Sequence, residues 1–132
     1  MYLMRALVVE RSIEQRANWV GALQGMGFEC LCADDGIEAL QLASTQGVDV
    51  VVMDIETSRI GGADLVHLIA SGLFGDRPPP TIVSVRDDQC FKPGRTGSFL
   101  KVVTKANAST NLTDIVDRAM GLIEDLQQRQ SA

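Results

Sequence analysis

The chain has 132 residues, of which 45% are hydrophobic and 22% are charged, and this is the composition of one soluble globular domain with its own core. The net charge of −5 argues against a nucleic-acid-binding surface, which would need clustered Lys and Arg. No apolar run approaches the roughly 20 residues that a membrane-spanning helix needs, so we expect no membrane association.

The first half of the chain alternates between predicted strands and helices. Residues 6–10, ALVVE, form a β-branched run that predicts a strand, and Ser12 can cap a helix over 13–26. A second short strand is predicted over 28–32. The turn ADDG at 33–36 then leads into a helix that stops at Gly47.

The second half continues the alternation. Strands are predicted over 48–53, 81–85 and 99–103, and helices over 63–73 and about 111–128, the last capped by Ser109 or Thr110. The segment 86–97 differs, because Pro93-Gly94 breaks any long helix there. The basic residues of this segment are interpreted as solvated or as a partner contact: Arg86, Lys92 and Arg95.

Strands that alternate with helices imply right-handed crossovers and a parallel sheet covered on both faces. In such a fold, ligands and chemistry lie at the carboxyl ends of the strands. Four polar residues stand at or just after predicted strand ends: Glu10, Asp54, Ser84 and Lys105. We therefore expect them to converge on one edge of the sheet.

Several stretches together resemble the receiver domains of bacterial two-component response regulators. They are LVVERSIEQR, ADDGIEAL, VDVVVMDI with Gly62 eight residues after Asp54, and VVTK before a capped last helix. The resemblance covers roughly residues 4–126 and implies a single domain over 1–132. It also implies a doubly wound (βα)5, flavodoxin-like α/β fold, with a parallel five-stranded sheet in the order 2-1-3-4-5. Pro93-Gly94 departs from the family here and predicts a shortened or irregular fourth helix.

The resemblance implies a role for each matching residue. Asp54 would be the phosphoacceptor, Lys105 would pair with the phosphoryl oxygens, and Ser84 would be the switch hydroxyl. Counting from Pro80 instead of Pro79 places Val85 at the switch position. A carboxylate nucleophile with a cation nearby is a plausible phosphoryl-transfer centre.

The implied partners are a sensor histidine kinase or phosphotransfer protein and a downstream protein, with output by protein–protein interaction. We expect a monomer or a weak homodimer. It would not be an enzyme beyond slow self-phosphorylation and autodephosphorylation.

The acidic pocket of the family is altered here. Receivers usually carry two adjacent acids after the first strand, and these align with Glu10 and Arg11. A guanidinium cannot ligate Mg²⁺, so Arg11 would repel the ion and could pair with Asp54 instead. We expect weakened or lost Mg²⁺ binding and no other cofactor. Glu56 adds negative charge where a phosphoryl group must enter.

Four other positions also depart from the family pattern. Thr57-Ser58 replaces the usual Met-Pro turn, Ala106 replaces the proline after the lysine, and Val102 replaces the switch aromatic. These departures leave two functions open. One is a stand-alone receiver phosphorylated on Asp54, and the other is a phosphorylation-independent pseudo-receiver that binds a protein.

A cofactor enzyme on the same architecture is the third hypothesis. Dinucleotide or flavin binding needs a glycine loop after the first strand, and ERSIEQR has none. Cobalamin domains of this shape carry D-x-H-x-x-G, and DIETSR lacks the histidine.

The three cysteines rule out a complete disulfide framework because their number is odd. Cys30 and Cys32 would point to the same face of a strand, which suits two small buried side chains better than a metal site. His67, the only histidine, is interpreted as an exposed or half-buried helix residue. We expect a reducing, cytoplasmic setting.

Overall fold

The computed structural model describes residues 3–57, 59–72, 77–86, 99–104 and 112–131, with side chains up to residue 121. The strands are β1 Arg5–Val9, β2 Glu29–Ala33, β3 Val50–Asp54, β4 Thr81–Val85 and β5 Leu100–Thr104. The helices of this part of the chain are α1 Ile13–Gly25, α2 Gly36–Thr45, α3 Gly62–Ala70 and α5 Leu112–Ser131.

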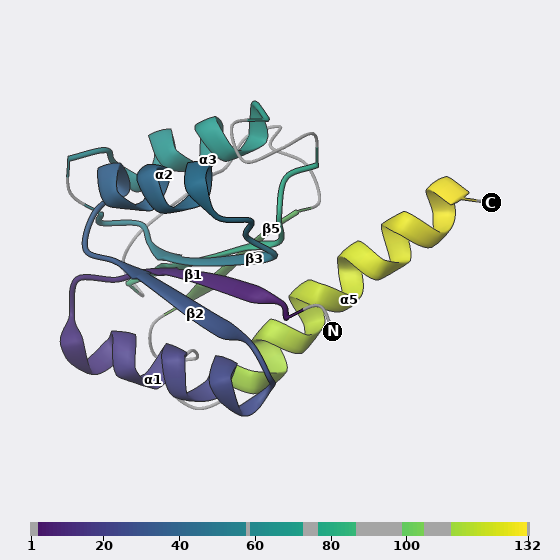
Figure 1. Cartoon of the computed structure of the whole chain (residues 1–132), viewed down its shortest axis with the longest axis horizontal. Coiled ribbons are helices and arrows are strands. Elements are labelled where there is room, and N and C mark those ends of the chain that lie inside the picture. The colour runs from purple at the N-terminus through teal and green to yellow at the C-terminus, as the bar shows by residue number, and fades with distance from the viewer. Residues whose placement is uncertain (1–2, 58, 73–76, 87–98, 105–111, 132) are drawn as a thin grey trace.

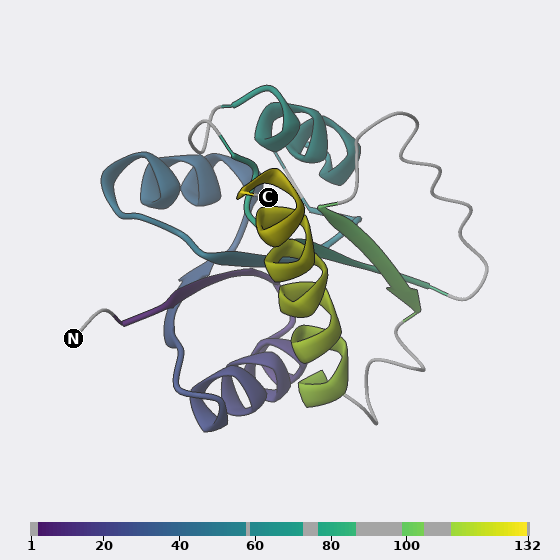
Figure 2. The same cartoon turned by 90° about the vertical axis from the view of Figure 1, so that its right-hand side faces the viewer.

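The five strands form one parallel sheet in the order β2-β1-β3-β4-β5. Helices α2 and α3 cover one face, and α1 and the first part of α5 cover the other (Figure 1). Figure 2 shows the same two layers from the side on which α5 crosses the molecule. The predicted doubly wound, flavodoxin-like fold and its strand order are confirmed.

The core lies in two layers because successive side chains of a strand point to opposite faces. Ala6 and Val8 of β1 pack toward α1 and α5, in a cluster that includes Trp19 and Val116. Leu7, at the position between them, packs in the second cluster with residues of α2 and α3. Strands buried on both faces explain the continuous apolar runs in the sequence.

The predicted elements agree with the observed ones except at their ends. The strand predicted over 48–53 begins at Val50 and ends on Asp54, because Asp54 pairs with β4. The helix predicted over 63–73 begins at Gly62 and ends at Ala70. The predictions for a broken fourth helix and for a cap at Ser109 or Thr110 fall outside the described residues.

Helix α5 is the longest helix of the described part, and its yellow C-terminal end extends away from the sheet (Figure 1). Ile115, Val116 and Ala119 of its first turns are buried in the cluster that it shares with α1. Within the described residues, no helix has the length and apolar character needed to cross a bilayer.

Candidate functional site at the carboxyl edge of the sheet

Asp54 and Ser84 are direct neighbours at the carboxyl ends of β3 and β4. They are paired in the parallel register, and the amide of Ile55 donates to the Ser84 carbonyl at 3.0 Å. The Asp54 carboxylate accepts a hydrogen bond from the amide of Glu56 at 3.1 Å. This bond turns the chain away from the sheet directly after the strand, so Asp54 stands at the edge.

Ser84 is buried, with 2% of its surface exposed, and its hydroxyl has no hydrogen-bond partner within the described part of the chain. Val85, the other candidate for the switch position, is buried in the cluster beneath α2 and α3. Consecutive residues of a strand face opposite sides, so Ser84 faces away from that cluster. Between the two candidates, only Ser84 offers a polar atom in register with Asp54.

Glu10 follows β1 directly and is buried, with 3% of its surface exposed. Its carboxylate accepts from the amide of Ser12 at 3.0 Å, which shapes the turn into α1. Arg16, one turn into α1, donates to the Glu10 carbonyl at 2.9 and 2.7 Å and pairs with Asp34. Sequence reasoning did not find Arg16, because its partners are a backbone carbonyl and a residue of another loop.

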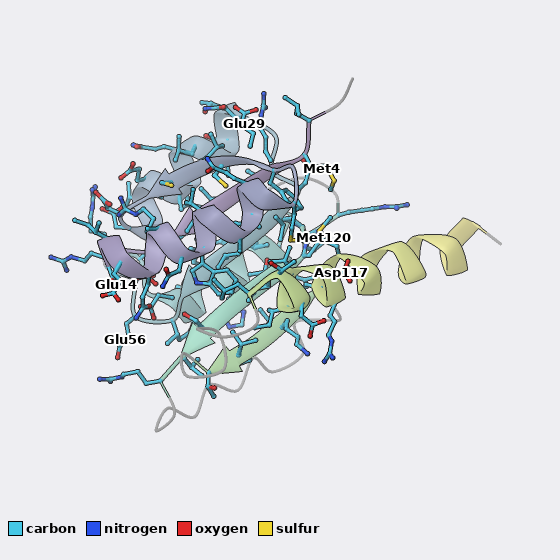
Figure 3. The ribbon with its side chains drawn as sticks, turned by 90° about the horizontal axis from the view of Figure 1, so that it is seen from below. Met4, Glu14, Glu29, Glu56, Asp117 and Met120 are labelled. Atoms are coloured by element: carbon cyan, nitrogen blue, oxygen red, sulfur yellow. The ribbon has the colours of Figure 1, made fainter. Side chains whose placement is uncertain are left out.

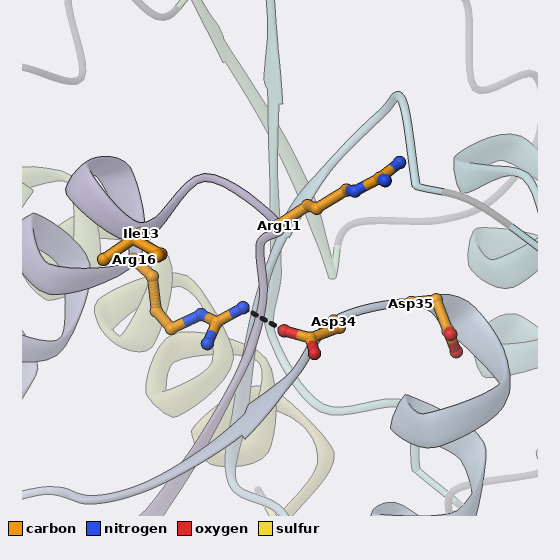
Figure 4. A pocket seen from close by; sticks show the side chains of 5 residues that line it. All are labelled: Arg11, Ile13, Arg16, Asp34 and Asp35. Atoms are coloured by element: carbon orange, nitrogen blue, oxygen red, sulfur yellow. Dashed lines mark hydrogen bonds and ion pairs between the residues drawn. The ribbon is translucent and has the colours of Figure 1, made fainter.

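Arg11 is exposed and lines an open pocket of about 490 Å³ between the β1–α1 and β2–α2 loops. The other lining residues are Ile13, Arg16, Asp34 and Asp35. Figure 4 shows the Arg11 side chain pointing away from the Arg16–Asp34 pair. The hypothesis that Arg11 pairs with Asp54 is not supported, because no such ion pair occurs among the described residues. A solvent-exposed guanidinium stays hydrated, and an ion pair made by such a group therefore adds little stability.

The residues at this edge are a poor match for Mg²⁺. This ion needs near-octahedral oxygen ligands, and the position after Glu10 carries a cation instead of a carboxylate. Within the described residues, no group of three His, Cys, Asp or Glu side chains is placed to hold a metal ion.

The loop that follows Asp54 is tied to α2. Thr57 donates its hydroxyl hydrogen to the Ile60 carbonyl at 2.8 Å. Arg59, in the left-handed region at φ 69°, pairs with Asp35 at 3.2 Å. A Cβ placed on Gly36 would lie 2.8 Å from the Cβ of Ile60, so the glycine of the ADDG turn permits this close approach.

The same loop is also tied to the end of β4. Glu56 Oε1 and Arg86 Nη2 form an ion pair of 2.6 Å. Figure 3 shows Glu56 and Glu14 at the same end of the molecule, away from Met4 and Met120. Arg86 is 57% exposed, as its interpretation as a solvated residue predicted, and the structure adds this ion pair to it. The sequence signal for this ion pair is the spacing of its residues. Arg86 stands two residues after Ser84, as Glu56 stands two residues after Asp54.

Three of the remaining predicted residues lie outside the described part of the chain: Ser58, Lys105 and Ala106. Val102 is 37% exposed. His67 is exposed, which was one of the two predicted alternatives.

Cys30 and Cys32 are free and half-buried against the α1 and α5 layer. Burial there raises the pKa of both thiols and keeps them protonated.

The sequence model described as the response regulator receiver domain matches residues 6–117. The chain belongs to this family. Receiver domains of this type serve two-component signalling, and they interact with histidine kinases or phosphotransfer proteins.

Curated relatives of this receiver domain are longer proteins. The chain is 32% identical to the CAI-1 autoinducer sensor kinase/phosphatase CqsS of Vibrio cholerae, over 75% of this chain and 17% of that protein. It is 31% identical to the response regulator MprA of a Mycobacterium species, over 64% of this chain and 36% of that protein. The chain thus spans well under half of the length of both relatives.

Solved structures share the fold of this receiver domain. The chemotaxis response regulator CheY4 of Vibrio cholerae matches with a TM-score of 0.76 and 22% identity, over 89% of this chain and 99% of that one. The receiver domain of the sensor histidine kinase PA1611 from Pseudomonas aeruginosa, solved with a coordinated magnesium ion, matches with a TM-score of 0.74 and 21% identity. That match covers 91% of this chain and 99% of the other.

Proposed function

We propose that this receiver domain accepts a phosphoryl group on Asp54 and passes the signal on by protein–protein contact. The supporting observation is the pairing of Asp54 with Ser84, whose buried hydroxyl has no hydrogen-bond partner within the described residues. A buried hydroxyl without a partner is costly, so a phosphoryl oxygen on Asp54 would supply the acceptor that it lacks.

The transfer itself needs little covalent chemistry from the protein. The Asp54 carboxylate attacks the phosphorus of a phosphohistidine, the P–N bond breaks, and the imidazole leaves with the electron pair and takes up a proton. Lys105 is carried over from the family as the cation for the phosphoryl oxygens. Ser84 would donate its hydroxyl hydrogen to one of them.

Arg11 supports a second candidate, a phosphorylation-independent module that binds a protein. It places a positive charge where the family has its second acid, and Mg²⁺ binding is proposed to be weakened or lost for that reason. The retained Asp54 and Ser84 pairing favours the first candidate.

The deciding experiment is an amide NMR titration with Mg²⁺ and then with beryllofluoride, a phosphoryl mimic. The variants are wild type, Asp54→Ala and Arg11→Asp, with acetyl phosphate labelling followed by intact mass in parallel. We expect shifts near Asp54 and Ser84 in wild type that are absent in Asp54→Ala, and tighter Mg²⁺ binding in Arg11→Asp.

Two other outcomes would change the conclusion. No response of wild type to either reagent, with a response restored in Arg11→Asp, would establish the phosphorylation-independent module. A wild type that binds Mg²⁺ as tightly as Arg11→Asp would contradict the proposed loss of the metal site.

A further inference from the structure

The loops that leave β3 and β4 carry opposite charges just beyond Asp54 and Ser84. Glu56 stands two residues after Asp54, and Arg86 stands two residues after Ser84. Because Asp54 and Ser84 are paired in the sheet, the two charged residues lie at matching positions beyond the strand ends. Their side chains meet in the 2.6 Å ion pair. The pair therefore lies beside the mouth of the proposed acceptor site.

Arg86 lies within reach of a group bound to Asp54. Neighbouring strands are about 4.8 Å apart, and two residues of extended chain span about 6.6 Å. The arginine side chain is long enough to cover the second distance and already turns toward β3 to reach Glu56. Rotation of this side chain away from Glu56 would carry the guanidinium toward the end of β3.

The ion pair is also easy to exchange. The Arg86 and Glu56 side chains are 57% and 44% exposed, and exposed pairs of this kind are weak because water competes for both charges. A phosphoryl group carries more negative charge than a carboxylate and offers three acceptor oxygens, which the planar fork of a guanidinium can bind in pairs. Arg86 would therefore leave Glu56 for a phosphoryl group on Asp54.

We infer that Arg86 is a further phosphoryl-binding residue of this site, held by Glu56 until Asp54 is phosphorylated. This inference rests on the proposed function. The exchange breaks the Glu56–Arg86 ion pair at the near end of the loop that follows β3. The far end of that loop stays anchored by the Arg59–Asp35 pair and by the contact of Ile60 with Gly36. The change in surface is thus confined to the residues next to Asp54.

The test is a double-mutant cycle read by beryllofluoride affinity. Wild type, Glu56→Gln, Arg86→Gln and the double variant are titrated with beryllofluoride and followed by amide NMR. Glu56→Gln removes the charge that pairs with Arg86 and is expected to tighten binding about threefold, while Arg86→Gln weakens it about fivefold. In the Arg86→Gln background, the gain from Glu56→Gln should largely disappear.

The matched control is Glu29→Gln. Glu29 pairs with Arg5 at 3.4 Å and is 46% exposed, but both residues stand at the opposite ends of their strands from Asp54. Glu29→Gln removes the same charge from a similar ion pair and should leave the beryllofluoride affinity unchanged. Equal affinities in all four proteins of the cycle, or a Glu56→Gln gain that persists without Arg86, would overturn the role of Arg86. No binding in any protein would overturn the proposed function, and this inference with it.

Discussion

Gly62 illustrates how one residue can be required by the backbone around a site. It begins α3, and its amide donates to the Ile55 carbonyl at 3.2 Å. A Cβ at this position would lie 2.3 Å from that carbonyl oxygen and 2.7 Å from the Ile55 Cα. Only glycine lets the start of α3 approach the residue that follows Asp54. The spacing of eight residues that supported the family resemblance thus has a steric cause.

Gly62→Ala is expected to lower the free energy of unfolding by about 2–3 kcal/mol, because backbone atoms of Ile55 would have to move. Gly21→Ala is the control, since Gly21 lies inside α1 and a Cβ added there would meet no atom within 4 Å. It should raise the free energy of unfolding by about 0.5–1 kcal/mol through helix propensity. Urea unfolding measures both, and equal effects would contradict the steric explanation.

At the scale of elements, Asp35 connects the start of α2 to the loop after Asp54. Its carboxylate accepts from the Glu38 amide at 2.9 Å as the N-cap and pairs with Arg59 at 3.2 Å. The amide hydrogen bond first, and then the Arg59 guanidinium, lower the pKa of Asp35 below its ordinary value. One side chain therefore positions two elements that flank the candidate site.

The lowered pKa of Asp35 predicts a pH dependence of stability. A carboxyl whose folded-state pKa lies below its unfolded value of about 3.9 stabilises the fold above that pH. The contribution is lost as the pH falls through the folded-state pKa. Asp35→Asn should therefore flatten the fall in stability below about pH 4.

Urea unfolding at several pH values checks this prediction. Asp64→Asn, at an exposed position in the first turn of α3, is the control for the removal of one carboxylate charge. An Asp35→Asn profile that runs parallel to wild type would show that the carboxylate does not make this contribution.

At the scale of the whole molecule, the α1 and α5 layer joins the two ends of the chain. Trp19 of α1 and Val116 of α5 are buried in one cluster with residues of β1, β3 and β4. Val116 is fully buried, so its contacts form only when the last helix docks on a sheet completed by distant strands. The stability of the domain therefore depends on this closing contact.

Val116→Ala is expected to lower the free energy of unfolding by about 2 kcal/mol, from lost apolar burial and the cavity that remains. Thr113→Ala, at an exposed position one turn earlier, should change it by less than about 0.5 kcal/mol. Fluorescence of Trp19, the only tryptophan, follows unfolding in urea. A Val116→Ala transition that coincides with wild type would show that α5 contributes little.

Local patterns determined the architecture of this protein. Strand and helix periods depend on neighbouring residues, so the runs around Val8 and Val52 and the cap at Ser12 predicted elements that the structure confirms. The rule that sites lie at the carboxyl ends of parallel strands then predicted, from the sequence alone, that Asp54 lies at an edge of the sheet.

Only the tertiary structure decided which side chains meet at that edge. A shift of one residue exchanges the two faces of a strand, so it was the observed register between β3 and β4 that paired Ser84, and not Val85, with Asp54. The Glu56–Arg86 pair and the exposed position of Arg11 likewise depend on how separate loops come together. Such contacts join residues far apart in the chain, and no local period in the sequence encodes them.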